Sequence, residues 1–287
     1  MLIREFRIVM PLSVDEFQRG QRYTIAKAER EAVEEGVGIM LVVSEHCQHD
    51  LYGDGVHQVK RFYLTSYLPS WVQSFIPSHS FYVLEESWNY YPYHCYSIFT
   101  CKILPNLRVE IFSCYLNDKG TTDNVFKLDP VVLKQSKVVV FDVINDRLKD
   151  NKGGRYNTEV FKCEKAKRGP LNKDWIDTQN EVMCSYKLIK SSVPIIGIQN
   201  KAECGIVEGL REVLYQTHKD SIMWLDEWFD ITYGELRELE LLLINQTTQH
   251  AKTMNGNDDV IVKIDRIAVV DSVTDSDDEF QDAQTDL

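Results

Sequence analysis

Two neighbouring segments at the start of the chain show different hydrophobic periodicities. Leu2 to Met10 alternates between core-facing and outward positions closely enough to predict a strand. Ser13 to Glu16 then has the form of a capping box, and Phe17, Gln21 and Ile25 recur at four-residue steps. This spacing predicts a helix whose otherwise apolar stripe carries one amide. A buried amide requires a hydrogen-bond partner.

The rest of the chain continues with strands and then long helices. From Gly38 to about Ile144 the pattern predicts short strands separated by turns, over 59–64, 81–84, 95–104, 108–115 and 137–144. A further strand is predicted over 184–193, and helical spacing returns from Ala202 to Leu214. Thr232 to Glu235 repeats the capping-box form and predicts a last helix towards His250. We expect a largely antiparallel sheet packed against long helices.

Several polar side chains fall on faces that should be apolar. Glu240 follows Leu236 by four residues and precedes Leu243 by three, so its carboxylate projects from the core-facing side of the last helix. An unpaired buried carboxylate is costly, so Glu240 lies either at the helix edge in water or against a partner inside. Taken alone, each such residue is more typical of the surface.

Taken together, these residues indicate a ligand. Lys60 and Lys187 lie in strand patterns among apolar neighbours, where a single lysine usually extends to solvent. With Gln21 and Glu240 they would supply an interior with amide, ammonium and carboxylate groups. Such a set suits a ligand that has a phosphate and hydroxyls attached to an apolar body, as a phospholipid headgroup has.

Composition and charge narrow the class of protein. The chain has 287 residues, 44% of them hydrophobic, which fits one main domain followed by a tail. The formal net charge is −12, and residues 271–287 carry seven acidic side chains without lysine or arginine. This balance argues against nucleic acid as the main partner. No segment resembles a signal peptide or reaches the ~18 apolar residues of a spanning helix, so we expect a cytoplasmic protein.

Catalytic and metal-binding motifs have little support in this sequence. The seven cysteines are scattered and never spaced Cys-x-x-Cys, which predicts reduced thiols. His46-Cys47-Gln48-His49 suggests a metal or Cys/His site, but the motif has no further ligand residues in an ordered element, and a surface loop is the better interpretation. We expect no enzyme, no metal and no cofactor apart from a bound phospholipid. A separate basic surface loop is predicted over 145–175, with Lys165, Lys167 and Arg168.

Four motifs carry a resemblance to a known family. They are Trp88-Asn89-Tyr90-Tyr91-Pro92-Tyr93, Lys167-Arg168-Gly169-Pro170-Leu171, Met183-Cys184-Ser185-Tyr186-Lys187-Leu188 and Trp224-Leu225-Asp226-Glu227-Trp228-Phe229-Asp230. In order and spacing they resemble the phosphatidylinositol transfer protein family over roughly residues 1–250. Tyr90-Tyr91 and Leu68-Pro69-Ser70-Trp71 are similar to its retinal degeneration B branch.

The resemblance implies a fold and an activity. The fold would be α+β over residues 1–254, with a curved, largely antiparallel sheet and long helices enclosing a single phospholipid cavity in a START-like manner. The activity would be extraction of phosphatidylinositol from one membrane and its delivery to another by a monomer. The second lipid would be phosphatidic acid, as in the retinal degeneration B branch, or phosphatidylcholine, as in classical members. The alternative is a lipid-sensing adaptor that presents phosphatidylinositol to a kinase without net transfer.

The resemblance also implies headgroup-binding residues. The inositol contacts would fall on Gln58, Lys60, Asn89 and Glu240, and the phosphate-side contacts on Gln21, Tyr96, Ser113 and Lys187. Two of these positions depart from the family pattern. The family usually has threonine at the position of Gln58, and a smaller hydroxyl residue at the position of Tyr96, beside which Ser97 is the alternative.

Membrane contact would come from two apolar segments. Trp71, Val72, Phe75 and Ile76 match the family's exchange loop, and their side chains suit a bilayer interface, although a buried loop is the competing interpretation. Ile195 and Ile196 stand where many relatives carry tryptophan before Gly197. We therefore expect a protein that is cytoplasmic and transiently membrane-associated.

The acidic segment 255–287 is expected to be a disordered tail. Glu279, Phe280, Asp282 and Ala283 are similar to the motif that binds VAMP-associated proteins of the endoplasmic reticulum, whereas Gln281 and Thr285 depart from it. An acidic solvated tail without a partner is the simpler interpretation. A functional motif would recruit the protein to contact sites of the endoplasmic reticulum.

Overall fold

The protein folds around one large sheet. The computed structural model describes residues 1–63, 81–146, 161–194, 196–255 and 263–264. In this part of the chain nine strands pair in the order β7-β1-β8-β6-β5-β4-β3-β2-β9. The strands are β1 (Leu2–Met10), β2 (Gly38–His49), β3 (Gly53–Tyr63), β4 (Tyr82–Tyr90), β5 (His94–Cys101), β6 (Leu104–Leu116), β7 (Lys137–Asp142), β8 (Met183–Ser192) and β9 (Lys263–Ile264).

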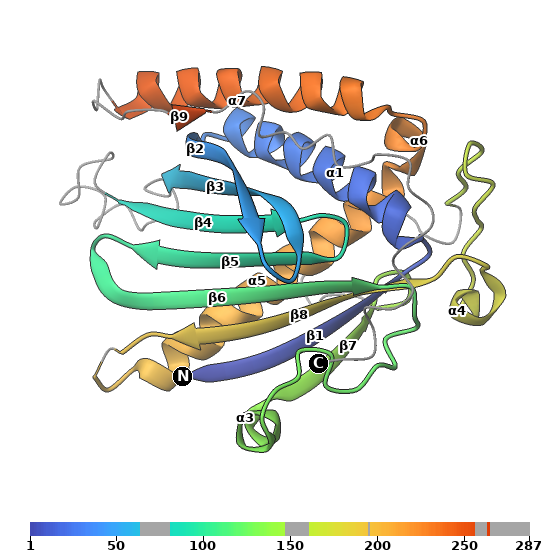
Figure 1. Ribbon diagram of the computed structural model, residues 1–287, viewed down its shortest axis with the longest axis horizontal. Coiled ribbons are helices and arrows are strands. Elements are labelled where there is room, and N and C mark those ends of the chain that lie inside the picture. Colours follow the sequence, from blue (N-terminus) through green and yellow to red (C-terminus); the bar gives the residue numbers. More distant parts are fainter. Residues whose placement is uncertain (64–80, 147–160, 195, 256–262, 265–287) are drawn as a thin grey trace.

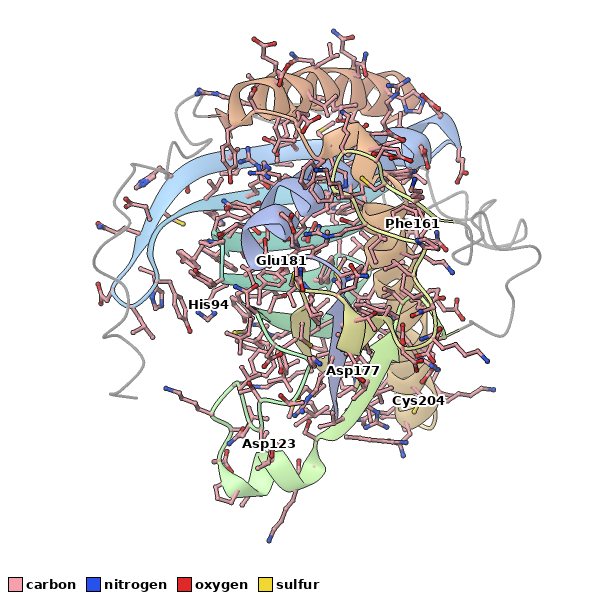
Figure 2. The ribbon with its side chains drawn as sticks, turned by 90° about the vertical axis from the view of Figure 1, so that its right-hand side faces the viewer. His94, Asp123, Phe161, Asp177, Glu181 and Cys204 are labelled. Atoms are coloured by element: carbon pink, nitrogen blue, oxygen red, sulfur yellow. The ribbon has the colours of Figure 1, made fainter. Side chains whose placement is uncertain are left out.

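The helices lie mostly on one side of this sheet. They are α1 (Val14–Glu34), α3 (Pro130–Gln135), α4 (Trp175–Thr178), α5 (Gln199–Met223), α6 (Leu225–Trp228) and α7 (Tyr233–Asn255). Helices α1 and α7 lie side by side across one end of the sheet, and α5 runs behind β1 and β8 (Figure 1). Seen from the side, α7 crosses the top of the molecule and α3 lies near Asp123 at the bottom (Figure 2).

The strand pairing confirms the predicted fold class. Only β1 with β7 and β2 with β9 pair in parallel, and the six other pairings are antiparallel. The α+β class with a curved, largely antiparallel sheet is therefore confirmed. Lys263 and Ile264 of β9 belong to the segment predicted as a tail, yet they pair with β2. None of the helices in the described ranges is long and apolar enough to cross a membrane.

Both predicted capping boxes are present. The Glu16 backbone N–H donates to Ser13 Oγ at 3.2 Å, and the Ser13 N–H donates to a Glu16 carboxylate oxygen at 2.8 Å. The same reciprocal pair joins Thr232 and Glu235 at the start of α7. These bonds satisfy backbone donors that the first turn of a helix leaves free, so the two helices begin where the sequence predicts.

The packed core borders the hollow part of the molecule, and Phe17 and Ile111 belong to both. It joins β1 and β8 to α5 and α6, and its largest fully buried side chains include Trp175, Trp228, Tyr186 and Phe6. Arg168, which was expected on a basic surface loop, is only 8% exposed and pairs with Glu16 at 2.8 Å. The expectation of a basic surface is therefore wrong for Arg168, because its charge supports the cap of α1.

Candidate functional site

A cavity of about 340 Å³ separates the inner face of the sheet from α1, α5 and α7. This volume is within the range of small-molecule pockets. Its lining divides by chemistry. Strands β2 to β6, β8 and helix α1 supply most of the polar side chains, and the remainder is largely aliphatic and aromatic, including Leu41, Phe99, Ile111, Leu210, Leu214 and Ile244. The cavity therefore suits an amphiphilic ligand.

A buried ammonium group marks one part of the polar lining. Lys187 on β8 is 5% exposed, and its Nζ donates to Ser113 Oγ and to the Tyr115 hydroxyl, both at 2.9 Å. Gln21 Nε2 on α1 donates to the same Tyr115 hydroxyl at 3.0 Å, which supplies the partner that the buried amide required. Burial lowers the pKa of Lys187 to about 8. This cluster of donors is suited to a phosphate group.

His218 also lines the cavity near this cluster, and both of its ring nitrogens already have partners within the protein. Its Nδ1 lies 2.7 Å from the Leu214 carbonyl, and its Nε2 lies 3.1 Å from Ser185 Oγ. Burial and the nearby charge of Lys187 lower the pKa of His218 to about 3. The imidazole is therefore neutral at physiological pH, and Lys187 is the cation of this cluster.

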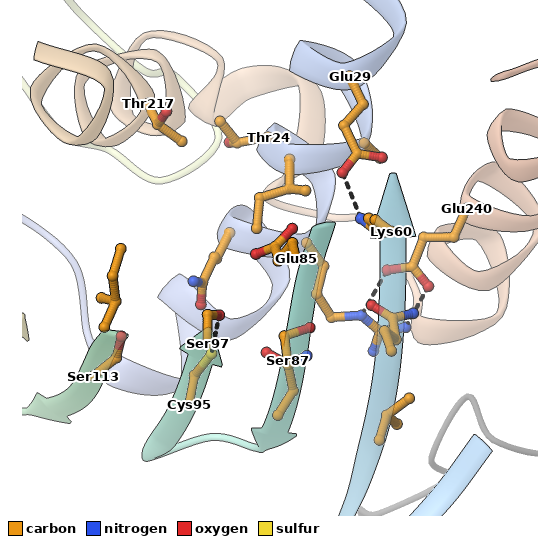
Figure 3. A pocket seen from close by; sticks show the side chains of 18 of the residues that line it. Thr24, Glu29, Lys60, Glu85, Ser87, Cys95, Ser97, Ser113, Thr217 and Glu240 are labelled. Carbon is orange, nitrogen blue, oxygen red and sulfur yellow. Dashed lines mark hydrogen bonds and ion pairs between the residues drawn. The ribbon is translucent and has the colours of Figure 1, made fainter. Parts of the chain in front are cut away.

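A second polar cluster surrounds Lys60 on β3. Its Nζ pairs with the Glu29 carboxylate of α1, and the Glu85 carboxylate of β4 is close enough to act on it (Figure 3). Burial disfavours the ammonium form of Lys60, but the Glu29 and Glu85 carboxylates outweigh that effect and raise its pKa. Burial also raises the pKa of Glu85, so this carboxyl group holds its proton more tightly than a free glutamate.

Glu240 on α7 has a partner inside the molecule. The Arg22 guanidinium of α1 donates to both of its carboxylate oxygens, at 2.9 and 2.8 Å (Figure 3). The rings of Tyr91 and Tyr233 lie 5.6 and 5.9 Å from the centre of that guanidinium. Glu240 therefore projects inward, as its position in the helical pattern required, and its charge is compensated by Arg22.

The remaining polar lining is uncharged. Gln58 Nε2 donates to Ser44 Oγ at 3.4 Å, and Asn89 lines the cavity beside the serines of β4 and β5, Ser87 and Ser97. Figure 3 shows Ser87, Ser97, Cys95 and Ser113 along successive strands of the sheet. Amide and hydroxyl groups of this kind recognise hydroxyls without fixing a charge.

Seven of the eight positions proposed for the headgroup lie together in this cavity. They are Gln21, Gln58, Lys60, Asn89, Ser113, Lys187 and Glu240. Tyr96 does not line it. The Tyr96 ring stacks on Trp88 and Phe112 on the other face of the sheet, and its hydroxyl donates to Glu110 at 2.5 Å. Tyr96 pairs with Trp88 while Ser97 pairs with Ser87, so the alternating pleat turns Ser97 inward and Tyr96 outward.

Sequence reasoning missed three charged residues of the site. Arg22, Glu29 and Glu85 were not singled out, although all three line the cavity. A signal for two of them exists in the sequence. Glu29 continues the four-residue series of Gln21 and Ile25, and Glu85 shares the strand parity of Asn89. No comparable signal marks Arg22, because its partner lies more than two hundred residues away along the chain.

Some expected contacts lie outside the described residues. These are Trp71, Val72, Phe75, Ile76, Ile195 and the tail residues Glu279, Phe280, Asp282 and Ala283. Ile196 is described, and its side chain is fully exposed. In the described part of the chain no group of three or more His, Cys, Asp or Glu side chains is arranged for a metal ion. His46 lies 3.3 Å from Asp54, and the ring of His49 stacks on Tyr52.

Comparison with known proteins supplies independent information. A family model described as phosphatidylinositol transfer protein matches residues 1–243. A cytoplasmic phosphatidylinositol transfer protein 1 of Drosophila melanogaster is 36% identical, over 89% of this chain and 93% of its own length. Its human namesake is 37% identical, over 84% and 72%. The retinal degeneration B protein of Drosophila melanogaster is 34% identical over 84% of this chain, which covers 20% of that larger protein.

Proposed function

The chain belongs to the phosphatidylinositol transfer protein family, and from that premise we propose that it extracts phosphatidylinositol from one membrane and exchanges it at another. Its family and relatives are lipid transfer proteins, not enzymes. The observation that carries the proposal is the cavity with its divided lining. A carrier must cover the apolar chains of its cargo from water, at about 0.8 kcal/mol for each buried CH₂ group, and must also satisfy a charged headgroup.

The cargo would lie in a definite orientation. The phosphate would accept hydrogen bonds from Lys187 and the neighbouring Ser113, with Gln21 at the edge of this cluster. The inositol hydroxyls would face Lys60, Asn89 and Glu240, with Gln58 and Ser97 also within the polar lining. The acyl chains would follow the aliphatic side chains of α5 and α7. In this orientation every polar group of the ligand meets a polar wall.

Phosphatidic acid is the second cargo that we favour. A quaternary ammonium such as choline is usually held by several aromatic ring faces around the cation. The aromatic residues of the described lining are Phe17, Tyr91 and Phe99. Tyr91 already faces the Arg22 guanidinium at 5.6 Å, and Phe17 packs against Tyr115 and His218. Phosphatidic acid needs only the phosphate cluster of Lys187 and Ser113. This comparison supports phosphatidic acid over phosphatidylcholine.

The place of action is the surface of membranes bordering the cytoplasm. We expect a monomer that has no cofactor other than its bound phospholipid and that docks transiently. Glu279, Phe280, Asp282 and Ala283 would bind a VAMP-associated protein and recruit the chain to the endoplasmic reticulum. Replacing Phe280 with alanine removes the aromatic anchor of that motif. Recruitment to the endoplasmic reticulum in cells should fall while transfer between purified vesicles is unchanged, and equal recruitment of both forms would dismiss the motif.

Two measurements on the full chain test the function itself. Native mass spectrometry of the purified protein should show one phosphatidylinositol or phosphatidic acid molecule per chain. The protein should then accelerate movement of labelled phosphatidylinositol from donor to acceptor vesicles. Stoichiometric binding without accelerated movement would favour the adaptor that presents its lipid to a kinase. A chain that carries no phospholipid after exposure to vesicles would contradict both functions.

A further inference from the structure

Helix α1 contributes an ion-pair partner to both Lys60 and Glu240, the two charged residues proposed to bind the inositol ring. Arg22 binds the Glu240 carboxylate through two hydrogen bonds, and Glu29 pairs with the Lys60 ammonium. Arg22 and Glu29 are seven residues apart, two helical turns, which places both on the side of α1 that faces the cavity. One helix thus compensates both of the charges that would otherwise meet the headgroup.

The two pairs are shielded from solvent. The side chains of Arg22, Lys60, Glu29 and Glu240 are 8%, 15%, 21% and 22% exposed. A buried charge without a partner is costly, and removing one member of a buried pair leaves the other charge uncompensated. The two ion pairs therefore determine whether the buried charges of Lys60 and Glu240 need a ligand to compensate them.

We infer that Arg22 and Glu29 are specificity-determining residues that allow the protein to hold a phospholipid with no headgroup alcohol. The inference rests on the proposed function, because it concerns the choice between phosphatidylinositol and phosphatidic acid in the same cavity. A phosphatidic acid molecule would occupy the phosphate cluster of Lys187 and leave both ion pairs intact. No charge at the inositol end would be left without a partner.

Phosphatidylinositol differs because its ring reaches these pairs. Lys60 has three N–H donors, and the Glu240 carboxylate has lone pairs beyond the two that Arg22 uses, so both side chains can bind hydroxyls while still paired. The ring adds hydrogen bonds to groups that are already compensated. Without Arg22, the same hydroxyls would become the main partners of Glu240, and without Glu29 they would share Lys60 with the Glu85 carboxylate. Only the inositol lipid could supply these hydroxyls.

The double variant Arg22→Met, Glu29→Gln tests this directly. It removes one positive and one negative charge, so the net charge of the protein is preserved. The variant should be incubated with phosphatidylcholine vesicles that contain equal amounts of phosphatidylinositol and phosphatidic acid, and the bound lipids should be measured by native mass spectrometry. We expect the ratio of bound phosphatidylinositol to bound phosphatidic acid to rise about tenfold. This is the change in an equilibrium that corresponds to the loss of one hydrogen bond to a charged group.

Helix α1 offers a matched control. Arg30 and Glu34 form a pair of the same charges at 3.1 Å on its exposed side, with side chains 61% and 63% exposed. Arg30→Met, Glu34→Gln therefore removes the same two charges from the same helix without touching the cavity. Its ratio of bound lipids should equal that of the wild type. Circular dichroism would establish that both variants keep the helical content of the wild type.

The possible outcomes separate this inference from the function on which it rests. A wild-type protein that binds neither lipid contradicts the proposed function. A wild type that binds both, with an unchanged ratio in the Arg22→Met, Glu29→Gln variant, overturns only the inference. A fall in the ratio would also overturn it, since the pairs would then orient Lys60 and Glu240 for the inositol ring. If the double variant is unfolded, Arg22→Lys and Glu29→Asp provide a second test, since the shorter side chains weaken both contacts and should shift the ratio in the same direction.

Discussion

Lys187 is the residue whose protonation state we expect to matter most for cargo binding. Its ammonium group is buried, and its pKa is lowered to about 8 by that burial. The unfolded chain binds this proton up to a higher pH than the folded chain does, so the empty protein gains stability as the pH rises from about 8 towards the usual pKa of lysine. Phosphate binding has the opposite requirement, because it favours the charged ammonium.

Binding of phosphatidylinositol should therefore weaken above about pH 8. Its phosphodiester keeps one negative charge throughout this range, so the titration is that of the protein. We expect affinity to fall by up to about tenfold per pH unit above pH 8, because a proton must be taken up on binding. Equilibrium binding to vesicles between pH 7 and pH 9.5 measures this. Lys187→Met should bind weakly at every pH in the range, and a wild-type affinity that stays constant to pH 9.5 would contradict the assignment.

Lys60 and Glu240 give a second prediction for single residues. Lys60→Ala leaves the Glu29 and Glu85 carboxylates without their cation, and Glu240→Ala leaves the buried Arg22 without its carboxylate. Either change would remove one proposed partner of the inositol hydroxyls and leave an opposing charge in the cavity. Phosphatidylinositol transfer between vesicles should fall at least about tenfold in each variant, while circular dichroism shows an intact fold. Unchanged transfer by both variants would reject the headgroup site.

The sequence predicts which residues face the interior better than it predicts their partners. Gln21 and Glu240 both line the cavity, although the sequence left Glu240 open between the helix edge and an interior partner. Both residues stand out because a helix repeats every 3.6 residues, so a polar residue on an apolar stripe is visible in the sequence. The ion pair of Arg22 with Glu240 was missed because periodicity carries no information on which helices pack together. The neighbouring positions Tyr96 and Ser97 show a different limit. A one-residue difference in strand register exchanges the two faces of the sheet, so only the observed pairing places Ser97 inward.

The contact of α1 with α6 depends on the absence of a side chain. Gly20 lies in the middle of α1, where alanine would normally stabilise the helix by up to about 1 kcal/mol. A Cβ atom at this position would lie 2.6 to 2.9 Å from three ring atoms of Trp228, which is fully buried. The ring has no room to move aside because it belongs to the packed core.

Gly20→Ala should therefore destabilise the protein despite the better helix propensity of alanine. We expect the free energy of unfolding to fall by about 1–3 kcal/mol, measured by urea denaturation. Gly209→Ala in α5 is the matched control, because a Cβ atom there meets nothing within 4 Å and the residue is exposed. That variant should be equally or more stable than the wild type. Stabilisation by Gly20→Ala would show that α6 does not pack against α1 as described.

Individual elements were predictable where their signals are local. The strand predicted over residues 2–10 agrees with β1, and the two capping boxes mark the starts of α1 and α7, because hydrophobic alternation and capping both act within a few residues. Long β strands were less clear. The pattern over 95–104 was interpreted as one strand, whereas β5 ends at Cys101 and β6 begins at Leu104. The tight turn between them contains no Gly, so the sequence has little signal that predicts a turn there.

At the scale of the whole molecule, the sheet encloses the cavity on one side and α1, α5 and α7 enclose it on the other, and both sides carry polar and apolar side chains. Figure 1 shows α1 and α7 across one end of the sheet and α5 behind it. The cavity lies where the sheet and the helices face each other, so its lining residues come from segments far apart in the sequence. Sequence patterns predicted most of the long elements and several polar residues, but not the short elements α3, α4, α6 and β9. The cavity itself results from the packing of α1, α5 and α7 on the sheet. Local sequence patterns carry no information on that packing.

The end of β8 supplies the last prediction, because it presents an apolar side chain to the surroundings. Ile196 is fully exposed just beyond β8, and it precedes Gly197, whose φ of +84° is in the left-handed region that favours glycine. The turn leaves Ile196 projecting from the fold. Burial of this side chain in a bilayer would make the free energy of membrane binding more favourable by about 1.4 kcal/mol or more. This corresponds to about tenfold in membrane affinity.

Ile196→Asp should therefore slow lipid transfer without emptying the cavity. We expect the initial rate of phosphatidylinositol transfer between vesicles to fall about tenfold, and co-sedimentation with the vesicles to fall in parallel. The amount of lipid bound to the purified variant should match that of the wild type, since Ile196 does not line the cavity. Val131→Asp on α3 is the control, because Val131 is also an exposed apolar residue but belongs to another part of the surface. Equal transfer by Ile196→Asp and wild type would mean that docking depends on other residues.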